Sequence, residues 1–220
     1  MSEETQTWIR HSLLLSALTG FVHLLQAVAG IALWSATSSP VLLAFGLDAL
    51  VGAGRETILT QRIGRYGDPD TTGLGELPFF RVAGGGYVAL GVVSLGLGFW
   101  MLWQGQRAGP SLLGIGLAAL SMLMIPIIGS YMKALAMELH SLELKAAAVF
   151  TFGNSYLSLV LLISLLVNAR MDLWWGDGLG AIIMAPFILQ KGIQILVGKP
   201  PSNSSRIEKG AARHASRVRQ

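Results

Sequence analysis

The feature that most limits how this chain can fold is a series of long stretches without charged side chains. Ser12 to Trp34 gives 23 consecutive residues with no formal charge, and a helix of that length crosses roughly 30 Å of hydrocarbon. Of the 220 residues, 52% are apolar and only 13% are charged, too few charges to cover a water-exposed surface. The sequence therefore predicts an integral membrane protein.

Six hydrophobic segments are long enough to be membrane spans, and they cover residues 12–34, 40–59, 82–103, 111–132, 146–167 and 174–197. We expect an all-α fold, a polytopic bundle of six transmembrane helices over residues 1–197 with a loop over 60–80. Residues 198–220 are predicted to form a basic, disordered tail. No cleavage site for a signal peptide follows the polar start of the chain, so the first span is expected to remain in the mature protein.

The basic residues divide very unequally between the two sides of such a bundle. Only Arg107 and Arg170 fall on the side of the first, third and fifth loops. Lys and Arg concentrate on cytoplasmic loops, which predicts that both termini are cytoplasmic. The lack of a transit-like N-terminus favours a bacterial inner membrane over an organelle. The fourteen on the side of the termini are Arg10, Arg55, Arg62, Arg65, Arg81, Lys133, Lys145, Lys191, Lys199, Arg206, Lys209, Arg213, Arg217 and Arg219.

Several function classes have little support in the sequence. The chain has no cysteine, which excludes disulfides, thiolate metal sites and cysteine nucleophiles. No nucleophile beside a base, and no paired acid and base, is visible at one membrane depth, so we expect neither an enzyme nor a resident cofactor. The basic tail is expected to lie against anionic lipid headgroups rather than nucleic acid, with an acidic soluble partner as the alternative.

Small residues in the third and fourth spans predict close helix packing. Gly84, Gly91 and Gly98 recur every seven residues, which places them along one narrow stripe of a helix. Gly114 and Ala118 are expected to act similarly in the fourth span. Since lipid offers no hydrophobic drive for helix association, such residues let backbones approach closely. We interpret them as structural helix contacts.

Asp48 is the most informative residue, because a carboxylate near the middle of a span is costly in lipid. One reading is functional, with Asp48 facing a cavity, an ion or a hydrogen-bond donor. The other is structural, a hydrogen bond or an ion pair with Arg55. Glu56 lies two turns beyond Asp48, and we expect it to reach the cytoplasmic interface and pair with Arg55 or Arg62.

Other polar residues at membrane depth allow two readings each. Asn154 lies in the fifth span, and His23 lies three residues before Gln26 on one face of the first. A membrane histidine can ligate a metal or relay protons, but a neutral histidine bonded to a carbonyl is more common. Asp177, beside Trp175, is interpreted as a helix N-terminal charge in an aromatic belt rather than an ion-capturing group.

Segments 39–56 and 144–159, in a six-span arrangement with both ends inside, resemble the cation diffusion facilitator superfamily, particularly its short six-span branch related to transmembrane protein 163. There, spans two and five each carry two ligands four residues apart, which together hold a divalent cation, often zinc. That spacing puts both donors on one helical face. The segment LKAAAVFTFGNSYLSL aligns without a gap with the family pattern LKADALHHRSDVLTSL. The segment WWGDGLGAIIMAPFILQKG resembles the family's sixth span.

Three of the four ligand positions that the resemblance implies carry other residue types. FGLDALVG keeps Asp48 but has Gly52 at the second position, and the fifth span has Phe150 for the histidine and Asn154 for the aspartate. One carboxylate and one amide make a poor tetrahedral zinc site. Their oxygens suit a harder or more hydrated cation, or Asp48 binds a proton without a metal. The candidate ion ligands are Asp48 and Asn154, with Glu56 and His23 as weaker ones.

Two functions follow, and both stay open at this point. The resemblance implies a secondary transporter that exchanges a divalent metal cation, zinc being the family's common cargo, against protons, with Asp48 reachable from each side in turn. The alternative is a transport-inactive scaffold or regulatory protein on the same fold, which the lost ligand positions favour. A homodimer would pair through membrane helices, since too few residues follow the sixth span for a folded domain.

Overall fold

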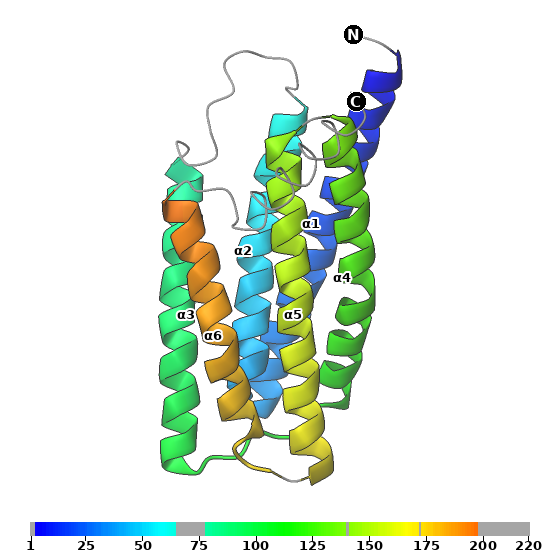
Figure 1. Cartoon of the computed structure of the whole chain (residues 1–220). Coiled ribbons are helices and arrows are strands. Elements are labelled where there is room, and N and C mark those ends of the chain that lie inside the picture. Colours follow the sequence, from blue (N-terminus) through cyan, green and yellow to red (C-terminus); the bar gives the residue numbers. More distant parts are fainter. Residues whose placement is uncertain (1–2, 65–77, 140, 172, 198–220) are drawn as a thin grey trace, which may run out of the picture.

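The described residues of the computed structural model, 3–64, 78–139, 141–171 and 173–197, form six α-helices without a strand among them. The helices run alternately up and down, so that α1 begins and α6 ends at the same end of the bundle, here called the terminal end (Figure 1). The opposite end is the far end. The predicted basic tail and most of the predicted 60–80 loop lie outside the described residues. The helices are α1 (Glu3–Thr37), α2 (Pro40–Ile63), α3 (Pro78–Gln104), α4 (Leu112–Glu138), α5 (Leu142–Met171) and α6 (Gly176–Leu196).

Helix α2 is the most enclosed element of the bundle. It packs against α1, α3, α5 and α6, whereas α3 pairs mainly with α6 and α4 mainly with α5. In Figure 1, α2 and α5 occupy the middle, with α3 and α6 on one side and α1 and α4 on the other. Side chains on α2 can therefore meet partners from most of the other helices.

Each predicted span overlaps one helix, and five of the six are long and apolar enough to cross a membrane: α1, α3, α4, α5 and α6. These five helices are what a multi-pass membrane protein requires. The exception is α2, because Asp48, Arg55 and Glu56 lie within it. All three side chains are buried among the other helices. The charges that lower the hydropathy of α2 are thus shielded from its surroundings.

Helix α1 has its polar face turned inward. Its outer surface exposes large apolar side chains such as Leu14, Phe21 and Val28. Its buried face carries Ser12, Ser16, Thr19, His23 and Gln26. In a water-soluble bundle the polar face would be outside. The inverted pattern fits a lipid-exposed helix that borders a polar interior.

The predicted glycine contacts are confirmed. All three glycines of the stripe, Gly84, Gly91 and Gly98, face α6. A Cβ added to Gly91 would lie 2.5 Å from a leucine side chain of α6, and one added to Gly98 would lie 2.7 Å from a backbone oxygen of α6. Gly114 and Ala118 are buried in the same way on the face of α4 that meets α5. Any side chain larger than hydrogen would push α3 away from α6.

A large apolar cluster fills the interior, mostly between the middle and the far end of the bundle. Its side chains interdigitate from α2, α5 and α6, and most are almost completely buried. We call it the far-side cluster. Its main members are Val41, Leu42, Ala44 and Phe45 of α2, Leu157, Leu161 and Leu165 of α5, and Met184 and Ile188 of α6.

Candidate functional site

The partner of Asp48 is Lys191, which reaches it from α6. The Lys191 ammonium Nζ donates to both carboxylate oxygens of Asp48, at 2.7 and 3.0 Å, and to Oδ1 of Asn154 at 2.5 Å. An ammonium has three N–H donors, and these contacts use all of them. All three residues are buried, with exposed fractions of 2% for Asp48, 6% for Lys191 and 4% for Asn154. A fully coordinated cation therefore joins α2, α5 and α6 inside the bundle.

The route of the Lys191 side chain depends on small and aromatic neighbours. It passes Gly153 of α5, where an added Cβ would lie 3.7 Å from Cε of the lysine. The Nζ atom then lies 5.6 Å from the ring centroid of Tyr87, a fully buried residue of α3. A cation at this distance from an aromatic face is attracted by the ring quadrupole. Helix α3 thus also contributes to holding the ammonium.

His23 extends the network to α1. Its Nε2 lies 2.9 Å from Nδ2 of Asn154. Because Lys191 can only donate, the oxygen of the Asn154 amide must face it, and the amide nitrogen must donate to His23. Nε2 is then the acceptor, which puts the proton of a neutral imidazole on Nδ1. That nitrogen faces Gly52, where an added Cβ would come within 3.2 Å of it.

A second buried ion pair lies nearer the terminal end. Arg55 donates from Nη2 to Oε1 of Glu56 at 2.6 Å, and the guanidinium carbon lies 4.8 Å from the ring centroid of Phe150. The predicted pairing of Glu56 with Arg55 is therefore found. Its predicted place at the interface is wrong, since Glu56 is completely buried in the bundle. The alternative pairing of Asp48 with Arg55 is also wrong, because Lys191 takes that role.

Lys191 is the site residue that the sequence interpretation missed. It was grouped with the basic residues on the side of the termini because it lies close to the end of the sixth span. Lysines in that position commonly extend toward the membrane surface. Here the side chain instead turns into the bundle. The available signal was Asp48 itself, since a mid-membrane carboxylate needs a cation, and Lys191 is the basic residue inside the sixth span.

The four positions that the family resemblance marks as ligands do not form a metal site in the described residues. Asp48 and Asn154 meet only through Lys191, Gly52 borders His23, and Phe150 carries the guanidinium of Arg55. No group of three or more His, Asp or Glu side chains within the described ranges is arranged to hold a metal ion. An ammonium occupies the point on which the oxygens of Asp48 and Asn154 converge.

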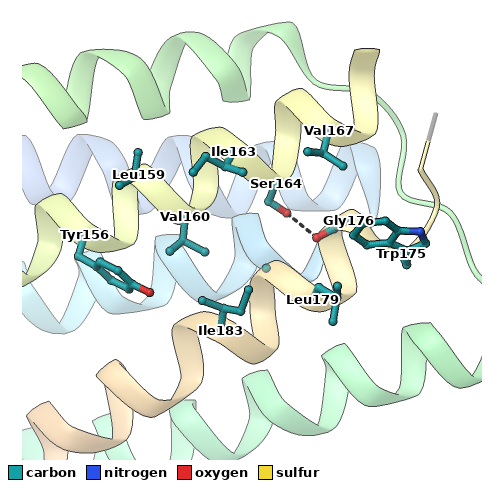
Figure 2. Close-up of a pocket in the computed structure, with 11 residues that line it drawn as sticks. Tyr156, Leu159, Val160, Ile163, Ser164, Val167, Trp175, Gly176, Leu179 and Ile183 are labelled. Carbon is teal, nitrogen blue, oxygen red and sulfur yellow. Dashed lines mark hydrogen bonds between the residues drawn. The ribbon is translucent and has the colours of Figure 1, made fainter. Parts of the chain in front are cut away.

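Asp177 lies in the first turn of α6, as predicted for a helix N-terminal charge. The side chain is buried, whereas its neighbour Trp175 is partly exposed. The single O–H of Ser164 donates to the carbonyl of Gly176 at 2.8 Å (Figure 2). Oδ1 of Asp177 lies 3.2 Å from the same hydroxyl and shares its proton in a bifurcated hydrogen bond. Asp177 therefore joins the start of α6 to α5 and is separate from the Asp48 network.

A cavity of about 280 Å³ lies between α5 and α6 near this junction (Figure 2). Its walls are almost entirely apolar, and no charged side chain lines it. Ile163, Leu179 and Ile183 on its wall are also exposed on the outer surface. The side-chain oxygens of its walls are the hydroxyls of Tyr156 and Ser164, and no carboxylate lines it. The cavity therefore does not compete with Asp48 as the ion site.

No family model matches the chain, and no curated protein sequence matches it. The resemblance to the cation diffusion facilitators therefore rests on the residues quoted above.

Proposed function

We propose that the protein is a proton-coupled cation transporter in which Lys191 occupies the cation site whenever no transported cation is bound. The observation that supports this proposal is the coordination of Nζ by three oxygens from Asp48 and Asn154. Converging oxygens around a positive charge are the chemistry of a hard-cation site. Lys191 is then a tethered competitor for the transported ion.

Charge balance links cation entry to protons. Asp48 and Lys191 together are neutral, so a divalent cation that joined them would add two positive charges to a buried site. Uncompensated charge in a low-dielectric interior is very costly. Release of the Lys191 proton lowers the net charge of the cation, Asp48 and Lys191 from +2 to +1 and frees the oxygens. Cation binding on one side and proton return from the other amount to antiport, the exchange that the family resemblance implies.

The ligands left when Lys191 withdraws are mixed. Asp48 supplies carboxylate oxygens, Asn154 an amide oxygen, and His23 the Nε2 atom that now accepts from Asn154. A set with one imidazole and hard oxygens suits borderline divalent cations such as zinc and also harder ones. His23, which the sequence marked only as a weaker candidate, would be the ligand that favours zinc.

We further propose that the terminal end faces the cytoplasm of a bacterial cell. Removing the buried Lys191 and Arg55 from the fourteen basic residues on that side leaves twelve, against two on the other. The excess of Lys and Arg therefore persists and supports this orientation.

The second candidate is the transport-inactive scaffold, and one observation favours it. Every hydrogen-bond donor of Lys191 is satisfied, and the far-side cluster packs directly beyond Asp48. A lysine whose donors are all satisfied needs no transported ion, and the network around it then has the structural role of holding α1, α2, α5 and α6 together. Cation flux distinguishes the two functions.

The test uses proteoliposomes with an imposed pH gradient and Zn²⁺, Mn²⁺ or Ca²⁺ as the cation. Wild type should show saturable, gradient-driven flux of at least one cation, and Asp48→Asn should abolish it. Lys191→Met should bind the cation more tightly and lose its dependence on the pH gradient. Lys133→Met, which removes an exposed lysine of α4, is the matched control and should behave as wild type.

Absence of flux for all three cations in folded wild-type protein would exclude the transporter and leave the scaffold. Flux that persists in Asp48→Asn would show that the ion does not use this site. Unchanged cation affinity in Lys191→Met would refute the role of Lys191 as competitor.

A further inference from the structure

Helices α1 and α2 are packed antiparallel along a narrow seam, with glycine at successive contact points. A Cβ added to Gly30 would lie 2.8 Å from Cα of Gly46, and one added to Gly20 would lie 3.3 Å from Cβ of Glu56. Between them, Gly52 faces His23. The seam therefore passes from the Asp48 network toward the terminal end, with Glu56 one turn beyond Gly52.

The polar face of α1 continues along this seam. Ser16 lies four residues before Gly20 and Ser12 four residues before Ser16, so all three share one face of the helix. Both serines are completely buried. From His23 to Ser12, the seam thus carries polar groups over about three helical turns.

Several buried polar atoms in and beside the seam lack a protein partner. Among the described residues, Nδ1 of His23, Oε2 of Glu56, Nε of Arg55 and the hydroxyls of Ser16 and Ser12 are buried without a hydrogen-bond partner. Each such group costs about 1–3 kcal/mol if nothing satisfies it. Buried polar groups that lack a protein partner are commonly satisfied by ordered water. Because several of these atoms lie along one seam, a connected set of water molecules would satisfy them together.

The other side of the network is different. Beyond Asp48 toward the far end, α2 presents Val41, Leu42 and Phe45 to the far-side cluster, and α5 presents Leu157 and Leu161. Apolar close packing offers a water molecule no hydrogen-bond partner. A second apolar cluster packs at the terminal end and includes Leu59 and Ile63 of α2, and within the described helices buried polar atoms without a partner also occur at Ser94 and Asp177. What distinguishes the α1–α2 seam is that several such atoms follow one another along a single helix contact.

We propose that a file of water molecules fills the α1–α2 seam and connects His23 with the terminal end, with Glu56 as its proton-binding group. The file ends one side chain, Asn154, away from Lys191. As a route for protons to the cation site this inference rests on the proposed function. The hydration of the seam is a separate property that is measurable without transport.

The test exploits the absence of cysteine, because any introduced thiol is then the sole thiol of the protein. Ag⁺ is about as small as water and reacts with a thiol by replacing its proton, forming an S–Ag bond and releasing H⁺ to water. The thiolate is the reacting form, and it arises where water reaches. Ser16→Cys and Ser12→Cys probe the seam. Ser158→Cys is the matched control, a fully buried serine of α5 beside the far-side cluster.

Ag⁺ is added in chloride-free buffer to either face of sealed vesicles, and the thiols left unreacted are counted by alkylation and mass after denaturation. Protease access to a C-terminal tag identifies the terminal side. From that side, Ser16→Cys and Ser12→Cys should react at least about tenfold faster than Ser158→Cys, because their thiols are hydrated. From the far side, all three should be protected. Size-exclusion elution confirms that each variant is folded.

Protection of both seam thiols from both sides in folded protein would overturn the water file. Equal reaction from the two sides, or equal reaction of Ser158→Cys, would overturn its one-sidedness. Seam thiols that react in a protein without cation flux would leave the file standing and remove the transporter. Cation flux in a protein whose seam thiols are fully protected would refute the water file and leave the transporter standing.

Discussion

The stability of the bundle should depend on Asp48 and Lys191 as a pair rather than on either residue alone. We consider Asp48→Asn, which keeps the side-chain shape, Lys191→Met, which keeps most of the aliphatic stem, and the double variant. In Lys191→Met, the Asp48 carboxylate loses both contacts to Nζ and Asn154 loses its donor. In Asp48→Asn, the ammonium keeps only neutral acceptors.

The expected magnitudes follow from the burial of both groups. Removing one member of a buried, hydrogen-bonded ion pair costs about 3–5 kcal/mol, because the remaining charge is left uncompensated. Replacing both members removes both charges, and such changes are often nearly neutral. The coupling energy of the cycle should therefore be at least about 2 kcal/mol. At about 2–4 °C per kcal/mol for a chain of this size, each single variant should lose about 10 °C in Tm. The double variant should recover most of that loss.

Thermal unfolding in detergent or lipid nanodiscs, followed by the fluorescence of the six tryptophans, measures the cycle at one fixed scan rate. Lys133→Met serves as the exposed control and should shift Tm little. Single variants no less stable than this control would refute the buried ion pair. A double variant whose loss equals the sum of the single losses would show that the two charges do not interact.

Three further predictions concern the helix contacts and use the same thermal assay. Gly98→Ala should destabilise the protein by about 1–3 kcal/mol through overpacking against α6. The control Gly96→Ala, where an added Cβ meets nothing within 4 Å, should be neutral or stabilising by up to about 1 kcal/mol. Equal losses of stability in the two variants would contradict the packing of α3 on α6. Gln26 donates to the Ser121 hydroxyl at 2.8 Å, and a Gln26→Leu and Ser121→Ala cycle should give a coupling of only about 0.6 kcal/mol. A coupling as large as that of the ion pair would count against this ranking. Ser164→Ala should cost about 1 kcal/mol by removing the hydroxyl that ties α5 to the start of α6, and an unchanged Tm would show that this hydrogen bond contributes nothing.

The sequence predicted the parts of this protein that depend on local composition. Helices long enough for a bilayer can be found from uncharged runs, because the requirement acts on each segment separately. The contact role of Gly84, Gly91 and Gly98 was also predictable, since a seven-residue spacing defines one face whatever the partner is. Helix α2 does not follow from composition in this way, because its three charges become tolerable only where other helices surround them.

The partners of the polar residues were not predictable in the same way. Asp48 was marked as the central residue, but the sequence suggested Arg55, seven positions away, as its cation. Arg55 is instead held by the adjacent Glu56 and by Phe150. His23 and Asn154 were separate candidates, and nothing in their local sequences indicated that they would form a hydrogen bond.

By itself, the amino-acid sequence determined that the chain forms apolar helices and that one carboxylate would be costly within them. Only the tertiary structure decided that Lys191, 143 positions from Asp48 along the chain, neutralises that carboxylate. The physical reason is that hydropathy and helical periodicity act within a segment, whereas the energy of a buried charge depends on whichever group the packing of other helices brings within hydrogen-bonding distance.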